Sequence, residues 1–307
     1  MTETAPPKKT RSLLERAAER YDFGEATRAR PDDAIIPPVI NPAPAPVIVE
    51  ASPRPPLPTR PQRVATIDRA RLAEHGLLVP GAPIGVLAEE FRSVKRQLLA
   101  TARVVRASDG DLSRTILVCS AQPDDGKTYC AINLAISLAA ERDVEVLLID
   151  ADFGKPDVMQ RLGLREGPGL LDALADPTRD VEACVVRTDI PQLSLLPSGR
   201  KTNADTELVA SARTGELIAQ LLATDPRRLL IFDSPPALTA SPAAALANHA
   251  GQVMFVVRAD KTSDSDLRDA VDLLVGCEQI NLLLNAVTLV TGRHRFGSYY
   301  GQQDDAI

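Results

Sequence analysis

The sequence has no tryptophan, and aromatic residues make up only 3% of its 307 positions. Proteins that bind single-stranded nucleic acid stack its bases on aromatic side chains, and proteins that bind its phosphate backbone are usually basic. This chain has few aromatic residues and a formal net charge of −6. We therefore expect no nucleic acid among its partners.

Cysteine and histidine are also scarce, with four and three residues. The cysteines, Cys119, Cys130, Cys184 and Cys277, lie far apart in the sequence, and none belongs to a Cys-x-x-Cys pair. The histidines are equally scattered. This spacing favours reduced thiols over a disulfide framework or a zinc site.

Long apolar runs are missing as well. No stretch reaches the roughly 18 uninterrupted apolar residues that a membrane-spanning helix needs, and the N-terminus lacks the apolar core of a signal peptide. We expect a cytoplasmic protein with no direct membrane span, which reaches a membrane only through a partner.

Proline is abundant but unevenly placed, since eleven of the 25 prolines fall within residues 31–61. Proline fixes the φ angle and removes a backbone donor, so this segment predicts an extended linker. Before it, Ser12 and Glu15 form a capping-box pattern that predicts a short helix over about residues 12–20. That helix is either a docking peptide for a partner or a transient helix in a disordered tail.

The composition divides the chain into three parts. We expect a disordered tail with the proline-rich linker over residues 1–66, one globular domain over residues 67–290 and a flexible tail over residues 291–307. At the start of the domain, apolar periodicity predicts helices over residues 67–75 and 84–103. The apolar face expected for the second helix consists of Ile84, Leu87, Phe91, Val94 and Leu98.

From Arg114 onward, short apolar segments alternate with helical patterns. The predicted strands cover residues 115–120, 144–150, 192–197, 229–236, 252–259 and 280–287. Continuous apolar strands are typical of a sheet that is covered on both faces, and their alternation with helices predicts a doubly wound, mostly parallel α/β sheet. Such sheets bind ligands at the carboxyl ends of their strands.

A phosphate-binding loop follows the first predicted strand. Its candidate nucleotide-binding residues are Gln122, Pro123, Asp124, Asp125, Gly126, Lys127, Thr128 and Tyr129. The pattern places backbone amides at a helix N-terminus, Lys127 at the β- and γ-phosphates and the Thr128 hydroxyl on Mg²⁺. An ordinary strand-to-helix turn is the alternative, but the position between a strand and a helix favours a nucleotide site.

Carboxylates end two further strands. Asp150 and Asp152 close the second predicted strand, where one can reach a metal ion and the other an incoming hydroxyl. Asp233 follows four apolar residues of a later strand, as the Mg²⁺-binding acid of P-loop proteins does. A solvated turn acid is the alternative for any one of them. The candidate catalytic residues are Lys127, Asp150 and Asp152, and the candidate metal ligands are Thr128, Asp150 and Asp233.

In their order and spacing these motifs resemble the bacterial tyrosine autokinases of exopolysaccharide loci (BY-kinases), in particular the branch linked to exosortase-associated polysaccharide clusters. The matching segments are LAEEFRSVKRQLL, the phosphate loop, DADFGKP, GPGLLDAL, TELVAS, IFDSPPAL and a tyrosine-bearing tail. The resemblance implies a P-loop fold of the MinD and ParA type that uses ATP and Mg²⁺. It also implies that Asp150 is a candidate base for a tyrosine hydroxyl.

The resemblance further implies an autokinase that regulates exopolysaccharide synthesis and phosphorylates tail tyrosines of a neighbouring subunit, here Tyr299 and Tyr300. Two leftover aromatics at a frayed terminus are the alternative. The family's E-x-x-R-x-x-R pattern, associated with contacts in a ring of subunits, falls on Glu89, Arg92 and Lys95, with Lys in place of the last Arg. An exposed helix face with ion pairs three residues apart is the alternative for this trio.

The implied activator is a membrane-embedded polysaccharide chain-length determinant of the Wzz type. Its cytoplasmic segment would complete the site and keep the chain at the inner membrane as a peripheral protein. A homo-oligomeric ring is the implied assembly.

Two positions depart from the family pattern. Asp124 stands where relatives carry glycine, and its carboxylate adds negative charge beside a triphosphate. Asn285 is followed by Ala286 instead of the usual Lys, at a position expected near the adenine. A catalytically weakened nucleotide-binding regulator is therefore an alternative. A partition ATPase of the ParA or MinD type is another, although Gln122 replaces its signature lysine.

Overall fold

The computed structural model describes residues 64–287 of the chain. The predicted helix at 12–20, the proline-rich segment 31–61 and the tail tyrosines Tyr299 and Tyr300 lie outside the described residues.

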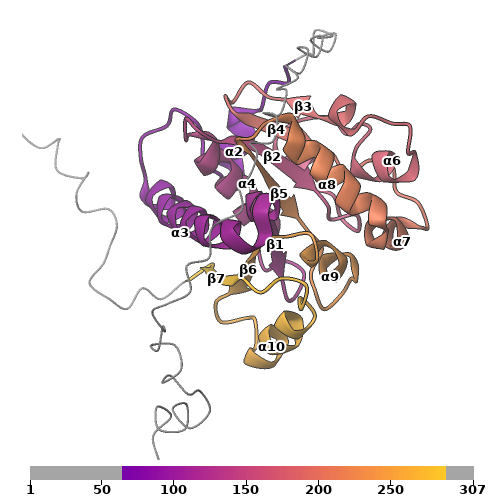
Figure 1. The fold of residues 1–307 in the computed structure, drawn as a ribbon. Helices are drawn as coiled ribbons and strands as arrows, with labels where there is room; N and C mark the ends of the chain where they lie inside the picture. The colour runs from indigo at the N-terminus through magenta and orange to yellow at the C-terminus, as the bar shows by residue number, and fades with distance from the viewer. Residues whose placement is uncertain (1–63, 288–307) are drawn as a thin grey trace, which may run out of the picture. The chain divides into compact units, whose positions relative to one another are not determined.

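A seven-stranded sheet with the order β3-β4-β2-β5-β1-β6-β7 forms the centre of the described domain (Figure 1). Its strands are β1 (Thr115–Ser120), β2 (Glu145–Asp150), β3 (Val186–Arg187), β4 (Leu193–Leu196), β5 (Arg228–Asp233), β6 (Gln252–Arg258) and β7 (Ile280–Asn285). All neighbouring strands run parallel, except that β3 is antiparallel to β4. The predicted doubly wound, mostly parallel α/β fold is confirmed. Strand β3 was not predicted, because two residues are too few to form an apolar pattern.

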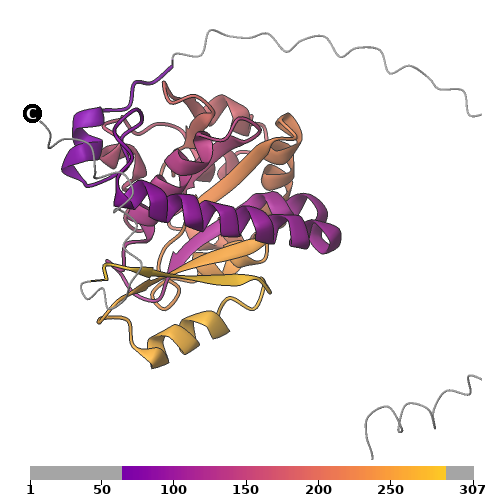
Figure 2. The same cartoon turned by 90° about the vertical axis from the view of Figure 1, so that its left-hand side faces the viewer.

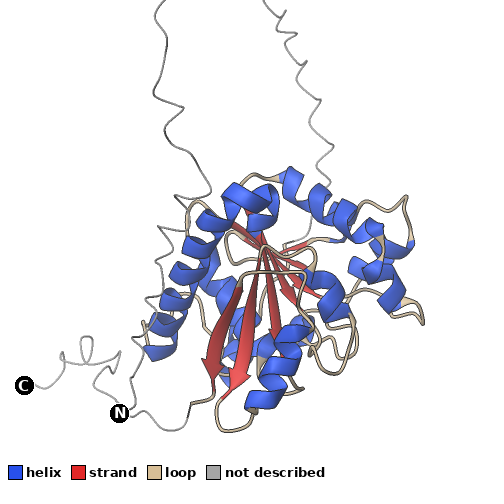
Figure 3. Ribbon diagram, turned by 60° about the horizontal axis from the view of Figure 1, so that its bottom comes forward, coloured by secondary structure: helices blue, strands red, loops and turns tan. Residues whose placement is uncertain are grey.

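Helices cover both faces of the sheet (Figures 2 and 3). One face packs against α2 (Arg69–Glu74), α3 (Val86–Asp109), α4 (Lys127–Ala139) and α5 (Val158–Arg161). The other face packs against α6 (Leu170–Ala175), α7 (Asp205–Ala210), α8 (Ala212–Thr224), α9 (Pro242–Ala247) and α10 (Asp264–Asp272). The short 3₁₀ helices η2 (Gly110–Arg114) and η3 (Val181–Cys184) complete the described elements.

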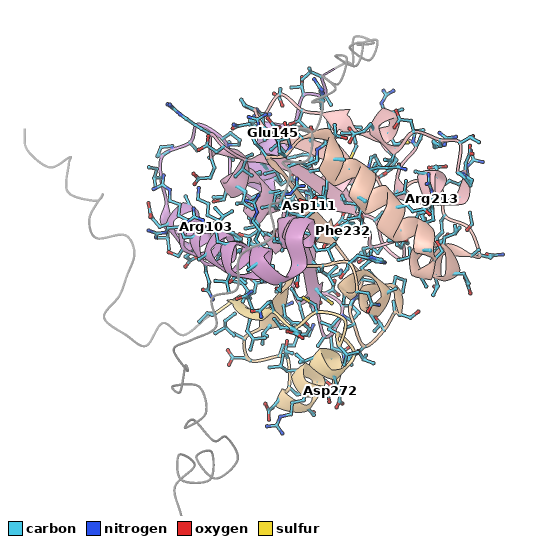
Figure 4. All side chains as sticks on the ribbon, viewed as in Figure 1. Arg103, Asp111, Glu145, Arg213, Phe232 and Asp272 are labelled. Atoms are coloured by element: carbon cyan, nitrogen blue, oxygen red, sulfur yellow. The ribbon has the colours of Figure 1, made fainter. Side chains whose placement is uncertain are left out.

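The strands are continuously apolar because their two faces meet two separate cores. In β5, Phe232 belongs to the core on the side of α6 and α8 (Figure 4), whereas the adjacent Ile231 belongs to the core on the side of α3 and α4. Successive side chains of a strand point to opposite faces, so a sheet buried on both sides needs apolar residues at every position.

Helix α3 is longer than predicted. It continues past the predicted end at residue 103 to Asp109, and Gly110 ends it with a φ of 55°, a positive value that favours glycine. Phe91 and Leu98 are buried as expected. Ile84 was expected on the same face, but it precedes the helix and is 43% exposed.

The four cysteines are buried free thiols, as expected. Within residues 64–287, no helix has both the length and the apolar character needed to cross a membrane.

Candidate functional site

The carboxyl ends of three adjacent strands bring the predicted site residues to one edge of the sheet. Strand β5 lies between β2 and β1. Asp150, the last residue of β2, is the register partner of Asp233, the last residue of β5. The phosphate loop leaves the end of β1 and leads into α4. Parallel pairing therefore places both acids beside the loop.

The loop has the backbone shape of an anion site. Gly126 has a φ of 100° and directly precedes Lys127, the first residue of α4. Asp124 has a φ of 63°, a left-handed conformation that aspartate adopts more readily than most residues. The loop amides and the free amides at the start of a 13-residue helix together favour a phosphate group.

The two loop carboxylates do not crowd this cradle. The Asp124 side chain is 74% exposed and lies 3.8 Å from Lys155 Nζ. Asp125 is buried, and its Oδ2 accepts a 3.0 Å hydrogen bond from the backbone N of Gln122. Their charges are thus directed to solvent and back into the loop, which lowers their repulsion toward a bound triphosphate.

A cavity of about 480 Å³ opens beside the loop. Its lining includes Pro123, Asp124, Gly126, Lys127, Thr128 and Tyr129 from the predicted nucleotide-binding set. Asp152 also lines it, and its Oδ2 lies 2.7 Å from Lys127 Nζ. The ammonium and the carboxylate are 12% and 7% exposed, so the cavity contains a largely desolvated ion pair.

The charge of Lys127 is stabilised by its neighbours. Burial lowers the pKa of the ammonium, but the carboxylates of Asp233 and Asp152 outweigh this effect and raise the pKa above its ordinary value. Lys127 is therefore protonated at neutral pH, as a phosphate-binding lysine must be.

Asp150 has a different environment from the one expected of a base. None of its surface is exposed, and its Oδ2 accepts hydrogen bonds from the backbone N of Asp157 and Val158, both at 3.1 Å. Its Oδ1 accepts a third from the Asp152 backbone N. Burial, and then the charge of Asp233, raises the pKa of Asp150 well above its usual range. In this conformation Asp150 positions the start of α5, and of the two acids at the end of β2 it is Asp152 that lines the cavity.

Asp233 is a fully buried acid beside Lys127 and Thr128. Neither of its carboxylate oxygens has a hydrogen bond of ordinary geometry, although the Thr128 hydroxyl is close enough to lower its pKa. Burial raises the pKa of Asp233 to about 7, although the charge of Lys127 opposes this. An unpartnered buried carboxylate needs a water molecule or a cation. With the Thr128 hydroxyl at the start of α4, this donor set fits Mg²⁺.

A complete protein cage for a metal is absent from residues 64–287, where no three His, Cys, Asp or Glu side chains are grouped at metal-binding distance. Mg²⁺ in P-loop proteins does not need such a cage, because it keeps several waters and takes the other ligands from substrate phosphates.

Among the cavity residues that sequence reasoning missed, two are charged. Arg161 and Asp157 both line it, and Arg161 Nε lies 2.5 Å from Asp157 Oδ2. Both belong to the segment at α5 that the Asp150 carboxylate positions. No local motif marks them, since their place depends on contacts with the end of β2. Lys155, the lysine of the segment DADFGKP, also lines the cavity.

Asn285 contacts the loop backbone. Its Nδ2 donates a 2.9 Å hydrogen bond to the carbonyl of Asp125, and a Cβ atom on Gly126 would come within 2.1 Å of the same nitrogen. The neighbouring Arg258, which the sequence did not single out, donates from Nη1 to the carbonyl of Asp124 at 2.7 Å.

Of the three residues expected at a subunit contact, Glu89 and Arg92 are partly exposed, whereas Lys95 is buried. On α3, Arg92 forms an ion pair with Glu89 at a partly exposed position. Lys95 is only 7% exposed, and its Nζ lies 3.0 Å from the Ser137 carbonyl and 2.6 Å from Glu141 Oε1. The charged group of Lys95 is thus bonded within its own chain.

Comparison with known proteins places these features in a family. The AAA domain family matches residues 113–279, more than half of the chain. EpsB of Ralstonia nicotianae is 32% identical over 189 residues, which cover 61% of this chain and 25% of EpsB. The chain thus spans about a quarter of that relative.

Two kinases match over more of their own length. The tyrosine-protein kinase YwqD of Bacillus subtilis is 27% identical over 240 residues, covering 78% of this chain and 96% of YwqD. The crystal structure of the VpsO kinase domain is similar with a TM-score of 0.52 and 29% identity, covering 64% of this chain and 98% of that domain. The chain belongs to the AAA domain family, and the resemblance to bacterial tyrosine kinases expected from its motifs is confirmed.

Proposed function

We propose that the chain is an ATP-dependent protein-tyrosine kinase that phosphorylates Tyr299 and Tyr300 in the tail of another copy. The observation that supports this most is the ion pair of Lys127 and Asp152 in the cavity beside the phosphate loop. An ammonium for the phosphates and a carboxylate for a hydroxyl are the two groups that this transfer requires.

The reaction follows from an exchange of partners. When ATP enters, the Lys127 ammonium moves from Asp152 to the β- and γ-phosphate oxygens. Asp152 is then free to accept the proton of a tyrosine hydroxyl, whose oxygen forms a bond to the γ-phosphorus. The bond from that phosphorus to the bridging oxygen breaks, and ADP leaves. Positioning of these groups supplies most of the catalysis in such transfers.

The proposed ligands of Mg²⁺ or of its bound waters are Thr128, Asp233 and Asp150. Asp150 is included because it is the last residue of β2, beside Asp233. The ion, when bound, would neutralise charge on the phosphates. Asp233 suits this role because both of its oxygens are buried without a hydrogen bond of ordinary geometry, and the Thr128 hydroxyl lies beside them.

The proposed biological setting follows from the family resemblance. The kinase acts in the regulation of exopolysaccharide synthesis, and a membrane-embedded chain-length determinant activates it at the cytoplasmic face of the inner membrane. A homo-oligomer brings the tail of one copy to the cavity of the next.

Phosphopeptide mapping of the full chain with Mg²⁺, ATP and the activator's cytoplasmic segment tests the kinase. We expect phosphotyrosine at Tyr299 or Tyr300, and none in Lys127→Met. For transfer between copies, Lys127→Met with an intact tail is mixed with an active chain carrying Tyr299→Phe and Tyr300→Phe. Phosphotyrosine then forms on the Lys127→Met copy. If the wild-type chain forms no phosphotyrosine with the activator present, the proposal is wrong.

A nucleotide-binding regulator without kinase activity is the second candidate. It is favoured by the exposed Asp124 carboxylate at the rim of the cavity, which adds negative charge where phosphates are expected. Binding of ATP and of the activator without tail phosphorylation identifies this function.

A further inference from the structure

The carbonyl groups of the phosphate loop are bonded by side chains that lie outside the loop. Arg258 Nη1 donates to the Asp124 carbonyl at 2.7 Å, and Asn285 Nδ2 donates to the Asp125 carbonyl at 2.9 Å. The two donors are separated from their acceptors by 134 and 160 residues of sequence. Two consecutive peptide groups are thus fixed by side chains at the ends of β6, which pairs with β1, and of β7.

The donors form a pair in the sheet. Arg258 is the last residue of β6, Asn285 is the last residue of β7, and the two are register partners. The Ala259 backbone N donates to the Asn285 carbonyl at 2.9 Å, which joins the strand ends beyond the last pair. Both side chains therefore project from one rigid end of the sheet, and not from mobile loops.

The orientation of these peptide groups decides whether the loop can bind an anion. A phosphate cradle needs consecutive amide N–H groups turned toward the ligand, so the carbonyls of the same segment must face away from it. In this loop the peptide between Asp124 and Asp125 follows a residue with a φ of 63°, and Gly126 has a φ of 100°. A hydrogen bond to each carbonyl stabilises this otherwise unfavourable backbone.

Asn285 approaches the loop at Gly126, so a side chain at position 126 would displace the Asn285 amide. A Cβ atom on Gly126 would lie 2.1 Å from Asn285 Nδ2. Directly after Asn285, Ala286 has a φ of 55°, a left-handed backbone that is unfavourable for an L-residue without local side-chain support. A strained residue next to a close contact indicates that the surrounding structure imposes this position.

We propose that Arg258 and Asn285 are positioning residues that hold the phosphate loop in its anion-binding conformation. The proposal rests on the nucleotide binding of the proposed function, but not on its kinase activity.

Calorimetric binding of ADP to the full chain tests the proposal. Arg258→Gln and Asn285→Ala each weaken ADP binding by about tenfold, the effect expected for a lost hydrogen bond of this kind. The double variant loses less ADP affinity than the product of the two single losses, because both hydrogen bonds fix the same loop. Arg258→Lys, which keeps a charged donor, recovers most of the affinity. With Mg²⁺ and ATP, KM rises while kcat at saturating ATP changes less than twofold.

Adenosine is the matched probe, because it lacks the phosphates that the loop would hold. Its affinity stays unchanged in both variants. The matched control variant is Arg268→Gln, which removes an exposed arginine from the nearby α10 and leaves ADP binding unchanged. Thermal unfolding without nucleotide checks that each variant folds.

Three results would overturn the proposal. The first is unchanged ADP affinity in Arg258→Gln and Asn285→Ala. The second is an equal loss for ADP and adenosine, which would indicate a contact with the base or a general loss of structure. The third is a wild-type chain that binds no ADP, which would also overturn the proposed function. ADP binding without phosphotyrosine would sink the kinase alone.

Discussion

The Lys127 ammonium and the Asp152 carboxylate form a 2.7 Å ion pair inside the cavity of the phosphate loop. The lysine that is expected to bind phosphates thus has a carboxylate partner within its own chain. Nucleotide binding must exchange one anionic partner for another, and the released carboxylate is then available for proton transfer.

Replacement of that carboxylate should separate binding from chemistry. In Asp152→Asn, Lys127 no longer has to leave an anionic partner, so we expect ADP to bind several-fold more tightly. Phosphate transfer to tyrosine should fall by about 10²–10⁴, the usual contribution of a general base. Calorimetry and phosphotyrosine detection measure the two effects.

The control for Asp152→Asn is Lys127→Met, which should lose both ADP binding and transfer. Weaker ADP binding by Asp152→Asn would mean that the carboxylate helps to place the ammonium instead of competing for it.

Asp233 should make the stability of the nucleotide-free protein depend on pH. Burial raises the pKa of this carboxyl to about 7 in the folded state, whereas an unfolded aspartate has its ordinary pKa near 3.9. A raised pKa contributes stability that is present below the unfolded value and is lost as the pH rises through about 7. We expect the free energy of unfolding to fall between about pH 4 and pH 8, by up to roughly 4 kcal/mol from this group.

The variant Asp233→Asn should flatten that decline, because an amide does not ionise. Denaturant unfolding at several pH values without nucleotide measures it. Asp150, whose pKa burial also raises, contributes to the same decline, so Asp150→Asn is the matched variant. Equal slopes in Asp233→Asn and the wild type would contradict the prediction.

The position of the site at the carboxyl ends of the strands was predictable, because the sequence signals that mark a strand end are local. An apolar strand followed by Asp150 or by Asp233 indicates a strand end, and parallel pairing then places those ends together. The loop was predictable for the same reason, since its residues are consecutive.

The remaining features depend on contacts between distant segments. Arg258 and Asn285 bond to the loop although more than a hundred residues of sequence separate them from it. Arg161 lies in the cavity only because the Asp150 carboxylate accepts from the backbone at the start of α5. The burial of Lys95 depends on the end of α4, where the Ser137 carbonyl accepts its hydrogen bond. No pattern of neighbouring residues encodes these contacts.

Asp124 should weaken nucleotide binding through its charge alone. Its φ of 63° is one that asparagine tolerates as well, so Asp124→Asn keeps the backbone and removes the charge. We expect ATP to bind several-fold more tightly to Asp124→Asn, with a smaller gain at high salt. Unchanged affinity would show that the carboxylate is fully screened.

Glycine at position 124 should also raise the free energy of unfolding through the backbone. Asp124→Gly removes both the charge and the cost of a side chain at positive φ, so the free energy of unfolding should rise by about 0.5–1 kcal/mol above that of Asp124→Asn. Denaturant unfolding of the two variants isolates this difference. Equal stabilities would show that the left-handed backbone at Asp124 carries no strain.

Lys95 and Arg92 should differ in what they stabilise, although the family pattern assigns both to a subunit contact. Lys95→Met removes the buried ammonium from the Ser137 carbonyl and from Glu141, and a buried acceptor without a partner costs about 1–3 kcal/mol. We expect the free energy of unfolding to fall by that amount without a change in assembly. Arg92→Gln breaks a partly exposed pair with Glu89, so its stability should change by less than about 1 kcal/mol.

Thermal unfolding and sedimentation at several protein concentrations distinguish these roles. If the pattern operates between subunits at its exposed residues, Arg92→Gln dissociates the oligomer while Lys95→Met lowers Tm. Lys95→Arg is the matched variant, because it keeps a charge but replaces a compact ammonium with a larger planar group. An unchanged Tm together with a dissociated oligomer in Lys95→Met would mean that Lys95 leaves Ser137 and Glu141 to bond across the subunit interface.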